Sequence, residues 1–276
     1  MDYNDVLYHT AVLLSECDGL LIGAGAGIGV DSGLPDFRGN KGLWGAYPTL
    51  ANLGLGFSEI ASPRSFTRTP EIAWGFYGHR LNLYRNTIPH DGFRILRQLG
   101  EPLKHGYFVY TSNVDGQFQK AGFDPKRVAE IHGTIHELQC LGPCCSQTWS
   151  ADSYAPVVDT SRCIITSPLP RCEYCDDIVR PNICMFDDPG WVSNKTEHQL
   201  TRFRDWKNRV IRPLIIEVGA GVAIPSVRYL SDSWGPPLVR INPSAPEVYK
   251  EGHVGVGARA LSFLTDLERL HGELHE

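Results

Sequence analysis

Four short runs along the chain are apolar at almost every position and then stop at a glycine or a polar residue. They are GLLIG (19–23), YFVYTSN (107–113), LIIEVGAG (214–221) and PLVRINP (237–243). A continuous apolar run predicts a parallel strand that is buried on both faces. Ligands of such sheets bind beyond the carboxyl ends of the strands, so the four polar ends are expected to meet at one crevice.

Three longer segments place apolar residues at helical spacing, and they are residues 5–17, 71–86 and 258–274. Helices that alternate with buried strands predict an α/β fold with a parallel sheet. Two insertions interrupt the strands. Residues 44–90 are rich in aromatic residues and proline, and residues 136–182 hold most of the cysteines.

The composition excludes several classes of protein. The chain has 276 residues, of which 42% are hydrophobic, which is enough for one large domain or two modest ones. A net charge of −5 lacks the basic footprint of a nucleic-acid-binding protein. The first residues are acidic, unlike a signal peptide, and no apolar run reaches the roughly 18 residues of a membrane-spanning helix. We therefore expect a cytoplasmic protein with no nucleic-acid or membrane partner.

Two close pairs of cysteines suggest a metal site. CLGPCC begins at Cys140 and CEYC spans Cys172 to Cys175. In a reducing compartment such pairs predict one structural zinc ion held by four thiolates, rather than disulfides. Three of the ligands are Cys140, Cys172 and Cys175, and the remaining one is either Cys144 or Cys145. The alternative is that these cysteines are buried thiols that bind no metal. Outside this set, Cys163 is expected to be free, and we expect core positions for Cys17 and Cys184.

The first predicted strand runs directly into a glycine-rich turn, GAGAGIG (23–29). Such a turn can present backbone N–H groups to phosphates at the start of a helix. Its spacing differs from the dinucleotide-binding fingerprint. It is followed within a dozen residues by Asp36, Phe37 and Arg38, and the planar guanidinium of an arginine suits a pyrophosphate.

Five motifs in this order resemble the sirtuins, which are NAD-dependent protein deacylases. They are GAG (25–27), SGLPDFRG (32–39), TSNVDG (111–116), IHG (131–133) and the four-cysteine module that follows. The resemblance spans residues 20 to 260. It implies a Rossmann-like parallel sheet with a smaller zinc-binding and helical domain, and NAD bound in the cleft between the two domains. The large domain would comprise residues 1–45, 91–135 and 183–276. The small domain would comprise a helical insertion (46–90) and a zinc module (136–182).

The resemblance also implies roles for individual residues. Asn113 and His132 would be catalytic: Asn113 would contact the nicotinamide ribose, and His132 would be the general base, because a neutral imidazole can accept a proton from a ribose hydroxyl. His136 is expected to be structural. The residues implied to bind NAD are Gly25, Ala26, Gly27, Asp36, Phe37, Arg38, Ser112, Asn113, Asp115, Gly219, Ala220, Gly221 and Asn242.

Within that set the resemblance separates the parts of the cofactor. The glycine turn would hold the pyrophosphate, and the loop at Asp36 would fold over the nicotinamide end. Asp115 would receive the nicotinamide carboxamide, and Asn242 would lie near the adenosine ribose. The acyl-lysine substrate would pair as a strand with residues 180–188.

The chain departs from the family pattern at several of these positions. Gly29, Ser112 and Gly221 replace residues with longer or hydroxylated side chains. In RPNICMFDD (180–188), Met185 replaces an aromatic residue and Asp187 replaces a glycine, so a carboxylate would repel acidic peptides there. The main hypothesis is an NAD-dependent lysine deacylase. The alternatives are an NAD glycohydrolase or ADP-ribosyltransferase that uses the same cleft, or a sensor of NAD or ADP-ribose without turnover.

Overall fold

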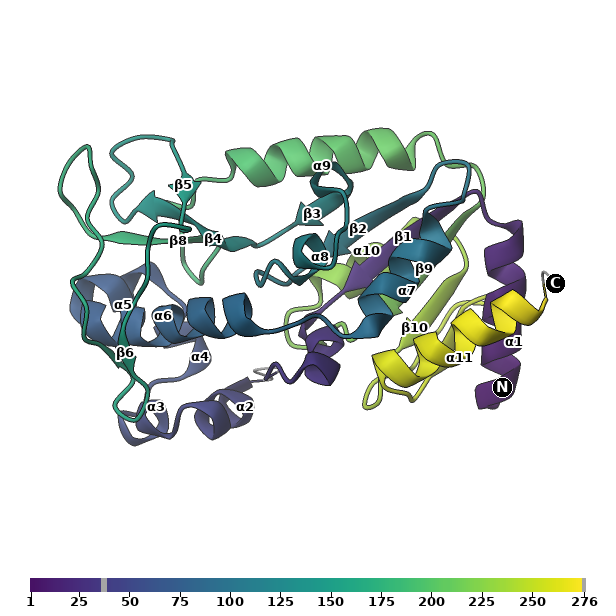
Figure 1. The fold of residues 1–276 in the computed structure, drawn as a ribbon, viewed down its shortest axis with the longest axis horizontal. Coiled ribbons are helices and arrows are strands. Elements are labelled where there is room, and N and C mark those ends of the chain that lie inside the picture. Colours follow the sequence, from purple (N-terminus) through teal and green to yellow (C-terminus); the bar gives the residue numbers. More distant parts are fainter. Residues whose placement is uncertain (36–38, 275–276) are drawn as a thin grey trace.

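The structure is a computed structural model that describes residues 1–35 and 39–274. A six-stranded parallel sheet lies at the centre of the larger part of the molecule (Figure 1). Its strands, in spatial order, are β11 (Val254–Val256), β10 (Leu238–Ile241), β9 (Pro213–Val218), β1 (Gly19–Ala24), β2 (Tyr107–Thr111) and β3 (Val128–Glu130). The α/β fold with a parallel sheet predicted from the apolar runs is therefore confirmed.

The centre of the sheet is β1, and every one of its residues is buried. It pairs in parallel with β2, where Leu20 lies opposite Tyr107, and with β9, where Leu20 lies opposite Leu214. This double pairing explains why the run is apolar at every position, since side chains on both faces meet covering helices.

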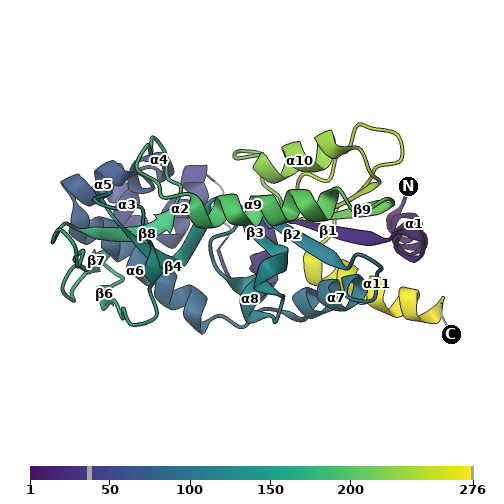
Figure 2. The same cartoon turned by 90° about the horizontal axis from the view of Figure 1, so that it is seen from above.

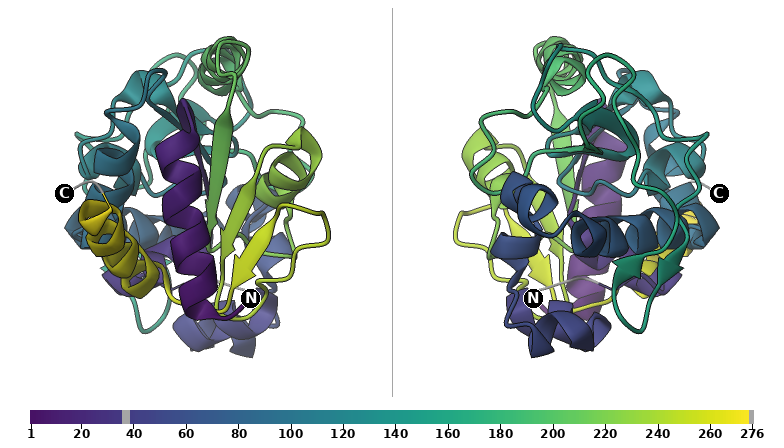
Figure 3. Two further views of the ribbon diagram at one scale, coloured as in Figure 1. Left: turned by 90° about the vertical axis from the view of Figure 1, so that its right-hand side faces the viewer. Right: turned by 90° about the vertical axis from the view of Figure 1, so that its left-hand side faces the viewer.

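Helices cover both faces of this sheet (Figure 3). One face packs against α1 (Tyr3–Glu16), α7 (Asp91–Gly100) and α11 (Ala260–Glu273) through the largest hydrophobic core. The other face packs against α9 (Asn194–Lys207), which contributes Phe203 and Trp206 to a second cluster on the sheet, and α10 (Ser226–Trp234) lies on the same side (Figure 2). The predicted helices at 5–17 and 258–274 correspond to α1 and α11.

The strand order creates a topological switch point between β1 and β9. From β1 the chain moves outward through β2 and β3 to one edge, and it later returns to the other side of β1 and moves outward through β9, β10 and β11. This is the Rossmann order, in which ligands bind at the carboxyl ends of the strands where the order reverses. The site is therefore expected beside the loops that follow β1 and β9.

The smaller part of the molecule lies at the far end from the chain termini (Figure 1). It combines helices with an antiparallel sheet of order β5-β4-β8 and a β6-β7 hairpin. Its elements are α2 (Gly39–Ala46), α3 (Pro48–Asn52), α4 (Phe57–Ile60), α5 (Pro63–Arg68), α6 (Pro70–Asn86), β4 (Gly133–Cys140), β5 (Trp149–Ser150), β6 (Val158–Asp159), β7 (Ile164–Ile165) and β8 (Val179–Ile183). Three short elements, η1 (Ala26–Ser32), α8 (Gln117–Lys120) and η2 (Pro125–Arg127), lie in loops of the large sheet.

A separate hydrophobic core holds this smaller part together. Trp74 of α6 is fully buried there, and its indole Nε1 donates a hydrogen bond to the carbonyl of Val179 on β8 at 2.8 Å. Leu43, Ile183 and Met185 also pack in this core, although they lie in ranges predicted for the large domain. The exact domain boundaries stay a prediction.

Across residues 1–35 and 39–274, no helix has both the length and the apolar character that crossing a membrane requires.

Candidate functional site at the β1–β9 switch point

The turn after β1 is packed directly against the turn after β9. The amides of Gly25 and Gly27 donate to the carbonyls of Val218 and Gly219 at 3.1 and 3.0 Å. A methyl group on Gly25 would lie 2.7 Å from Cα of Ala220. Position 25 must therefore be glycine for the two loops to pack together. The sequence suggested another reason for this glycine, a close approach of the backbone to phosphate. Contact of the turn with a cofactor stays a prediction.

Gly219 is the most constrained glycine of this pair of loops. Its φ is +61°, and an added Cβ would lie 2.4 Å from the backbone nitrogen of Ile28. A Cβ added to Gly221, two residues further on, would have no atom within 4 Å. Neighbouring glycines therefore differ in how far a side chain is tolerated.

We expect Gly219→Ala to lower the free energy of unfolding by roughly 2 kcal/mol or more, because a left-handed backbone and a backbone overlap both oppose the methyl group. Gly221→Ala is the matched control and should change it by about 0.5 kcal/mol or less. Urea unfolding followed by circular dichroism measures both. Equal effects of the two substitutions would show that the loops do not pack as described.

The end of β2 is tied to the glycine turn by a chain of hydrogen bonds. The hydroxyl of Thr111 and the amide of Ser112 both donate to the carbonyl of Ala24, at 3.0 and 3.1 Å. The Asn113 side-chain amide donates to the carbonyl of Gly25 at 3.2 Å, and its backbone amide donates to the Thr111 hydroxyl. Asn113 is thereby fixed at the carboxyl edge of the sheet while its side-chain oxygen is not used in these bonds.

Asp115 is buried in the turn that follows. Its carboxylate accepts a hydrogen bond from the amide of Gln117 at 3.0 Å, and burial raises its pKa to about 6. The ring of His136 donates through Nε2 to the carbonyl of Asp115 at 2.9 Å, since a carbonyl can only accept. A Cβ on Gly116 would lie 2.7 Å from that ring, so His136 clamps this turn. His136 lies on β4, and its contact has the structural character expected of it.

The raised pKa of Asp115 predicts that Asp115→Asn stabilises the folded protein at neutral pH. The pKa is about 6 in the folded protein against an ordinary 3.8, so the folded state binds the proton more tightly. The carboxylate therefore costs stability as pH rises from about 4 to 6, and the cost is complete above that range, at about 3 kcal/mol. We expect the variant to be more stable than the wild type at pH 8 and nearly equal near pH 3.5.

Denaturant midpoints at the two pH values test this expectation. The exposed Asp205→Asn is the control and should have little effect at either pH. An Asp115→Asn variant that is less stable than the wild type at pH 8 would contradict the assigned burial of an ionised carboxylate.

His132 follows β3 and lies beside the same edge of the sheet. Its carbonyl accepts a hydrogen bond from the amide of Cys184 at 2.9 Å, which links it to the end of β8. Burial lowers the pKa of the imidazole, and a hydrogen bond with the backbone of Ser112 opposes that effect. The ring is therefore neutral at neutral pH and can accept a proton. The residue after His132 must be glycine, because a Cβ on Gly133 would lie 2.2 Å from the carbonyl oxygen of Asn182.

Asn242 closes the site on the far side of the switch point. It is 1% exposed, and its side-chain amide donates to the carbonyl of Ala220 at 3.0 Å. Its side-chain oxygen accepts from the amides of Ser244 and Ala245. Arg228 of α10 donates to the carbonyls of both Ala220 and Ala245. Asn242 and Arg228 together fix the loops after β9 and β10 relative to each other.

The structure brings most of the predicted residues to one place. Asn113, Asp115 and Asn242 are buried polar side chains beyond the carboxyl ends of β2 and β10, with the loops at Gly25 and Gly219 between them. A further buried acceptor, Oε1 of Gln117, has no partner among the described residues. The side chain of Asn242 is already bonded to Ala220, Ser244 and Ala245, whereas the side-chain oxygen of Asn113 is not used in the bonds described above. Binding of NAD by this set stays a prediction. Asp36, Phe37 and Arg38 lie outside the described residues.

The loop after β8 is held by a buried ion pair. Arg180 donates to both carboxylate oxygens of Asp188 at 2.7 and 2.8 Å, and Asp188 also accepts from the amide of Met185. Asp187 is exposed and has a φ of +51°, a conformation that favours the glycine expected at this position. Met185 points into the core, whereas Cys184 is exposed, so the prediction that Cys184 is a core residue was wrong. Cys184 is exposed because it lies one residue past the end of the buried strand β8.

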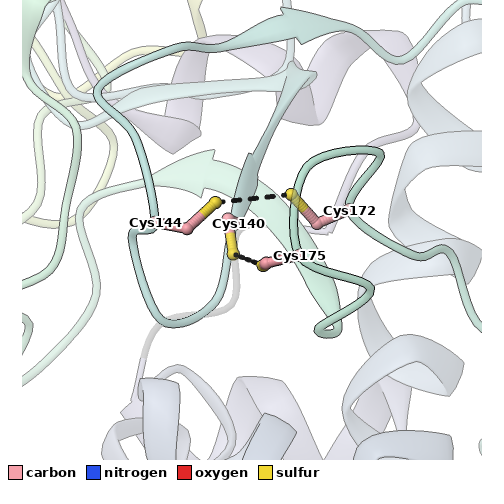
Figure 4. A group of neighbouring side chains, drawn as sticks. All are labelled: Cys140, Cys144, Cys172 and Cys175. Atoms are coloured by element: carbon pink, nitrogen blue, oxygen red, sulfur yellow. Dashed lines mark hydrogen bonds between the residues drawn. The ribbon is translucent and has the colours of Figure 1, made fainter.

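The four predicted zinc ligands form one cluster (Figure 4). The ligand atoms of Cys140, Cys144, Cys172 and Cys175 all lie within 4.8 Å of one another. The Sγ atoms are 3.5 Å apart between Cys140 and Cys175, and 3.6 Å apart between Cys144 and Cys172. A tetrahedron of thiolates with Zn–S bonds of about 2.3 Å has similar edges, so the donor set fits zinc with no open position. Cys145 lies outside the cluster, which decides between the two spacings left open by the sequence.

Sequence reasoning missed the residues that hold the site without belonging to a motif. Arg228 and Ser226 both lie at the start of α10, and Ser226 Oγ is 3.5 Å from Nε2 of His132. These contacts join positions that are far apart in the chain, so no local pattern signals them. The one signal in the sequence was that Ser226 and Arg228 come shortly after the glycine-containing loop that follows β9.

The chain is similar in sequence to several known proteins. The sequence profile of the Sir2 family matches residues 25–206. An NAD-dependent protein deacylase of Aquifex aeolicus (strain VF5) is 27% identical over 254 residues, which cover 91% of this chain and 93% of that protein. An NAD-dependent protein deacylase of Thermococcus kodakarensis is 32% identical over 184 residues, or 67% of this chain and 65% of that protein.

Solved structures show the same fold. A Sir2 homologue in complex with ADP-ribose is 25% identical, with a TM-score of 0.72 over 100% of this chain and 98% of that one. A Sir2 homologue in complex with NAD superposes with a TM-score of 0.73 over 97% of this chain and 94% of that one, at 24% identity.

Proposed function

Because the chain belongs to the Sir2 family, we propose that it is an NAD-dependent protein lysine deacylase. It acts on acyl-lysine in a protein or peptide and releases nicotinamide, free lysine and O-acyl-ADP-ribose. The observation that carries this proposal is the gathering of Asn113, Asp115 and His132 at one edge of the sheet, beside the switch point between β1 and β9.

NAD would supply the bond between ribose and nicotinamide that breaks, and the ribose hydroxyl that receives the acyl group. The chain supplies the groups that bind it. Asp115, ionised above its pKa of about 6, accepts from the nicotinamide carboxamide, and Asn113 orients the ribose. The remaining proposed contacts come from Gly25, Ala26, Gly27, Asp36, Phe37, Arg38, Ser112, Gly219, Ala220, Gly221 and Asn242.

His132 is the proposed general base. Burial keeps its imidazole neutral by lowering the pKa, so Nε2 can take the proton from the ribose hydroxyl that attacks the acyl carbon. Such a base must carry a lone pair on the nitrogen that faces the substrate.

Two further features of the proposal concern the acceptor and the compartment. The exposed Asp187, in the loop held by Arg180 and Asp188, disfavours acidic peptides. A cytoplasmic location is supported by the eight cysteines, all of which lie among the described residues and none of which is in a disulfide, as expected in a reducing compartment.

Nicotinamide release, measured with and without an acetyl-lysine peptide, tests the proposal. A deacylase releases nicotinamide at a rate that depends on the peptide, and the peptide loses its acetyl group. Release at the same rate without peptide would instead support NAD hydrolysis or ADP-ribosyl transfer. No release under either condition, with NAD still bound in calorimetry, would support a sensor.

A further inference from the structure

Gln139 is a fully buried glutamine on β4, next to the strand that leads into the expected peptide-binding segment. It lies opposite Arg180 of β8, and Asn182 follows two residues later on the same face of β8, because side chains alternate between the faces of a strand. All three side chains are 1% exposed or less. One face of the β4–β8 pair therefore carries three buried polar side chains.

The loop after β8 lies across this face and is bound there at every second residue. Asp188 is held by the buried ion pair described above. The carbonyl of Gly190 accepts from Nε2 of Gln139 at 2.8 Å. The amide of Val192 donates to Oε1 of Gln139 at 3.1 Å, and its carbonyl accepts from Nδ2 of Asn182 at 2.9 Å. Gln139 thus holds the loop at two points.

Four hydrogen bonds fix the orientation of the Gln139 side-chain amide. Nε2 donates to the carbonyls of Gly190 and Cys140 at 2.8 and 3.3 Å, and Oε1 accepts from the amides of Val192 and Asn182 at 3.1 and 2.9 Å. A carbonyl can only accept and an amide N–H can only donate, so the opposite orientation would break all four bonds. Because every donor and acceptor of this buried group is used, Gln139 is a rigid support for the loop.

This support reaches the segment in which the acyl-lysine peptide is expected to bind. Residues 184–187 contain the exposed side chains of that segment, and their turn is closed by Asp188, which accepts from the amide of Met185 at 3.1 Å. Only Pro189 separates Asp188 from Gly190. A displacement of Gly190 would therefore also displace Asp188 and the turn that it closes.

We propose that Gln139 is a positioning residue for the acyl-lysine substrate: it holds the loop at Gly190 and Val192 and thereby orders residues 184–187 for the peptide. This inference rests on the proposed function, in which the chain deacylates a peptide bound at that segment. A loop that is ordered before the peptide arrives removes an entropic cost from binding. Gln139 therefore acts on the affinity for the peptide, and not on the affinity for NAD or on the proton transfer to His132.

Kinetics of the full-length Gln139→Met and Trp74→Phe variants test the proposal. Methionine keeps the approximate size of glutamine and loses the four hydrogen bonds, so KM for an acetyl-lysine peptide should rise roughly five- to thirtyfold, while kcat and KM for NAD stay within about twofold of the wild type. Trp74→Phe is the control for a merely structural effect, because it removes a buried hydrogen bond to Val179 of β8 that does not involve Gln139. It should lower the melting temperature and leave KM for the peptide unchanged.

An unchanged KM for the peptide in Gln139→Met, or an equal rise in Trp74→Phe, would overturn the proposal.

Hydrogen exchange of the wild type tests the proposal even if Gln139→Met fails to fold. The amide of Val192 should exchange about 100-fold or more slowly than in an unstructured chain. An acetyl-lysine peptide should slow it further by roughly tenfold, because coupling between loop order and peptide binding is reciprocal. The amide of Leu141, which is bound to the carbonyl of Ile178 outside this loop, is the control and should change less. An unprotected Val192 amide, or one that the peptide slows no more than that of Leu141, would overturn the proposal.

The failure of this inference differs from the failure of the proposed function. A wild type that does not deacylate an acetyl-lysine peptide with NAD would overturn the proposed function, and this inference with it. An active wild type whose Gln139→Met variant keeps the wild-type KM for the peptide would overturn only the role of Gln139.

Discussion

Replacing His132 with alanine is expected to lower the rate of NAD-dependent deacylation by about 100- to 10,000-fold, the range that a positioned general base contributes. Binding of NAD should change little, because the proposed binding contacts come from the ends of β1, β2, β9 and β10 and not from the imidazole. The neutral state of His132, which follows from burial, makes it competent as a base at neutral pH.

Two measurements on this variant separate catalysis from binding. Steady-state kinetics with an acetyl-lysine peptide give the loss of rate, and isothermal titration calorimetry gives the affinity for NAD. The exposed His198→Ala, on α9, is the control and should behave as the wild type. A His132→Ala variant that retains more than about a tenth of the wild-type rate would remove the imidazole from the mechanism, because a general base supplies at least about 100-fold.

Replacing Cys144 with serine is expected to abolish zinc binding and with it the fold of the smaller part of the molecule. Cys140 and Cys172 belong to the hydrophobic core built around Trp74, so the metal site and this core support each other. Apparent binding free energies of structural zinc in peptides are about 10–16 kcal/mol, comparable to the whole stability of a domain at about 5–15 kcal/mol.

The neighbouring residue provides a matched control. Cys145 lies outside the cluster, so Cys145→Ser should retain one zinc ion per chain and the wild-type melting temperature. If Cys144→Ser is insoluble, chelation of the wild type gives the same information: zinc release should coincide with a loss of helical signal. Zinc retained by Cys144→Ser and lost by Cys145→Ser would contradict the assigned ligands.

The large sheet was predictable from the sequence wherever strands are buried on both faces. The apolar runs at 19–23, 107–113, 214–221 and 237–243 gave the four inner strands. The edge strands β3 and β11 were missed because each has only three residues, too few to set a period. The short helices α2 to α5 were likewise not resolved, since a helix of four to eight residues leaves little periodicity to detect.

The chemistry of the site was predictable where it lies in local motifs. The spacing of the cysteines indicated the metal cluster, and the polar ends of the strands indicated the crevice. Three-dimensional contacts were not predictable. The contact of Gly25 with Ala220, the clamp of His136 on Gly116 and the approach of Ser226 to His132 all depend on how separate loops pack. The exposure of Cys184 depends on where β8 ends, which a sequence places only to within a few residues.

Mass spectrometry of the products from NAD and an acetyl-lysine peptide tests the central claim most directly. The account predicts nicotinamide, deacetylated peptide and O-acetyl-ADP-ribose in equal amounts, because one ribose hydroxyl takes up each acyl group that leaves a lysine. Free ADP-ribose beside an unchanged acetyl-lysine peptide would contradict it, since the acyl group would then play no part in the reaction.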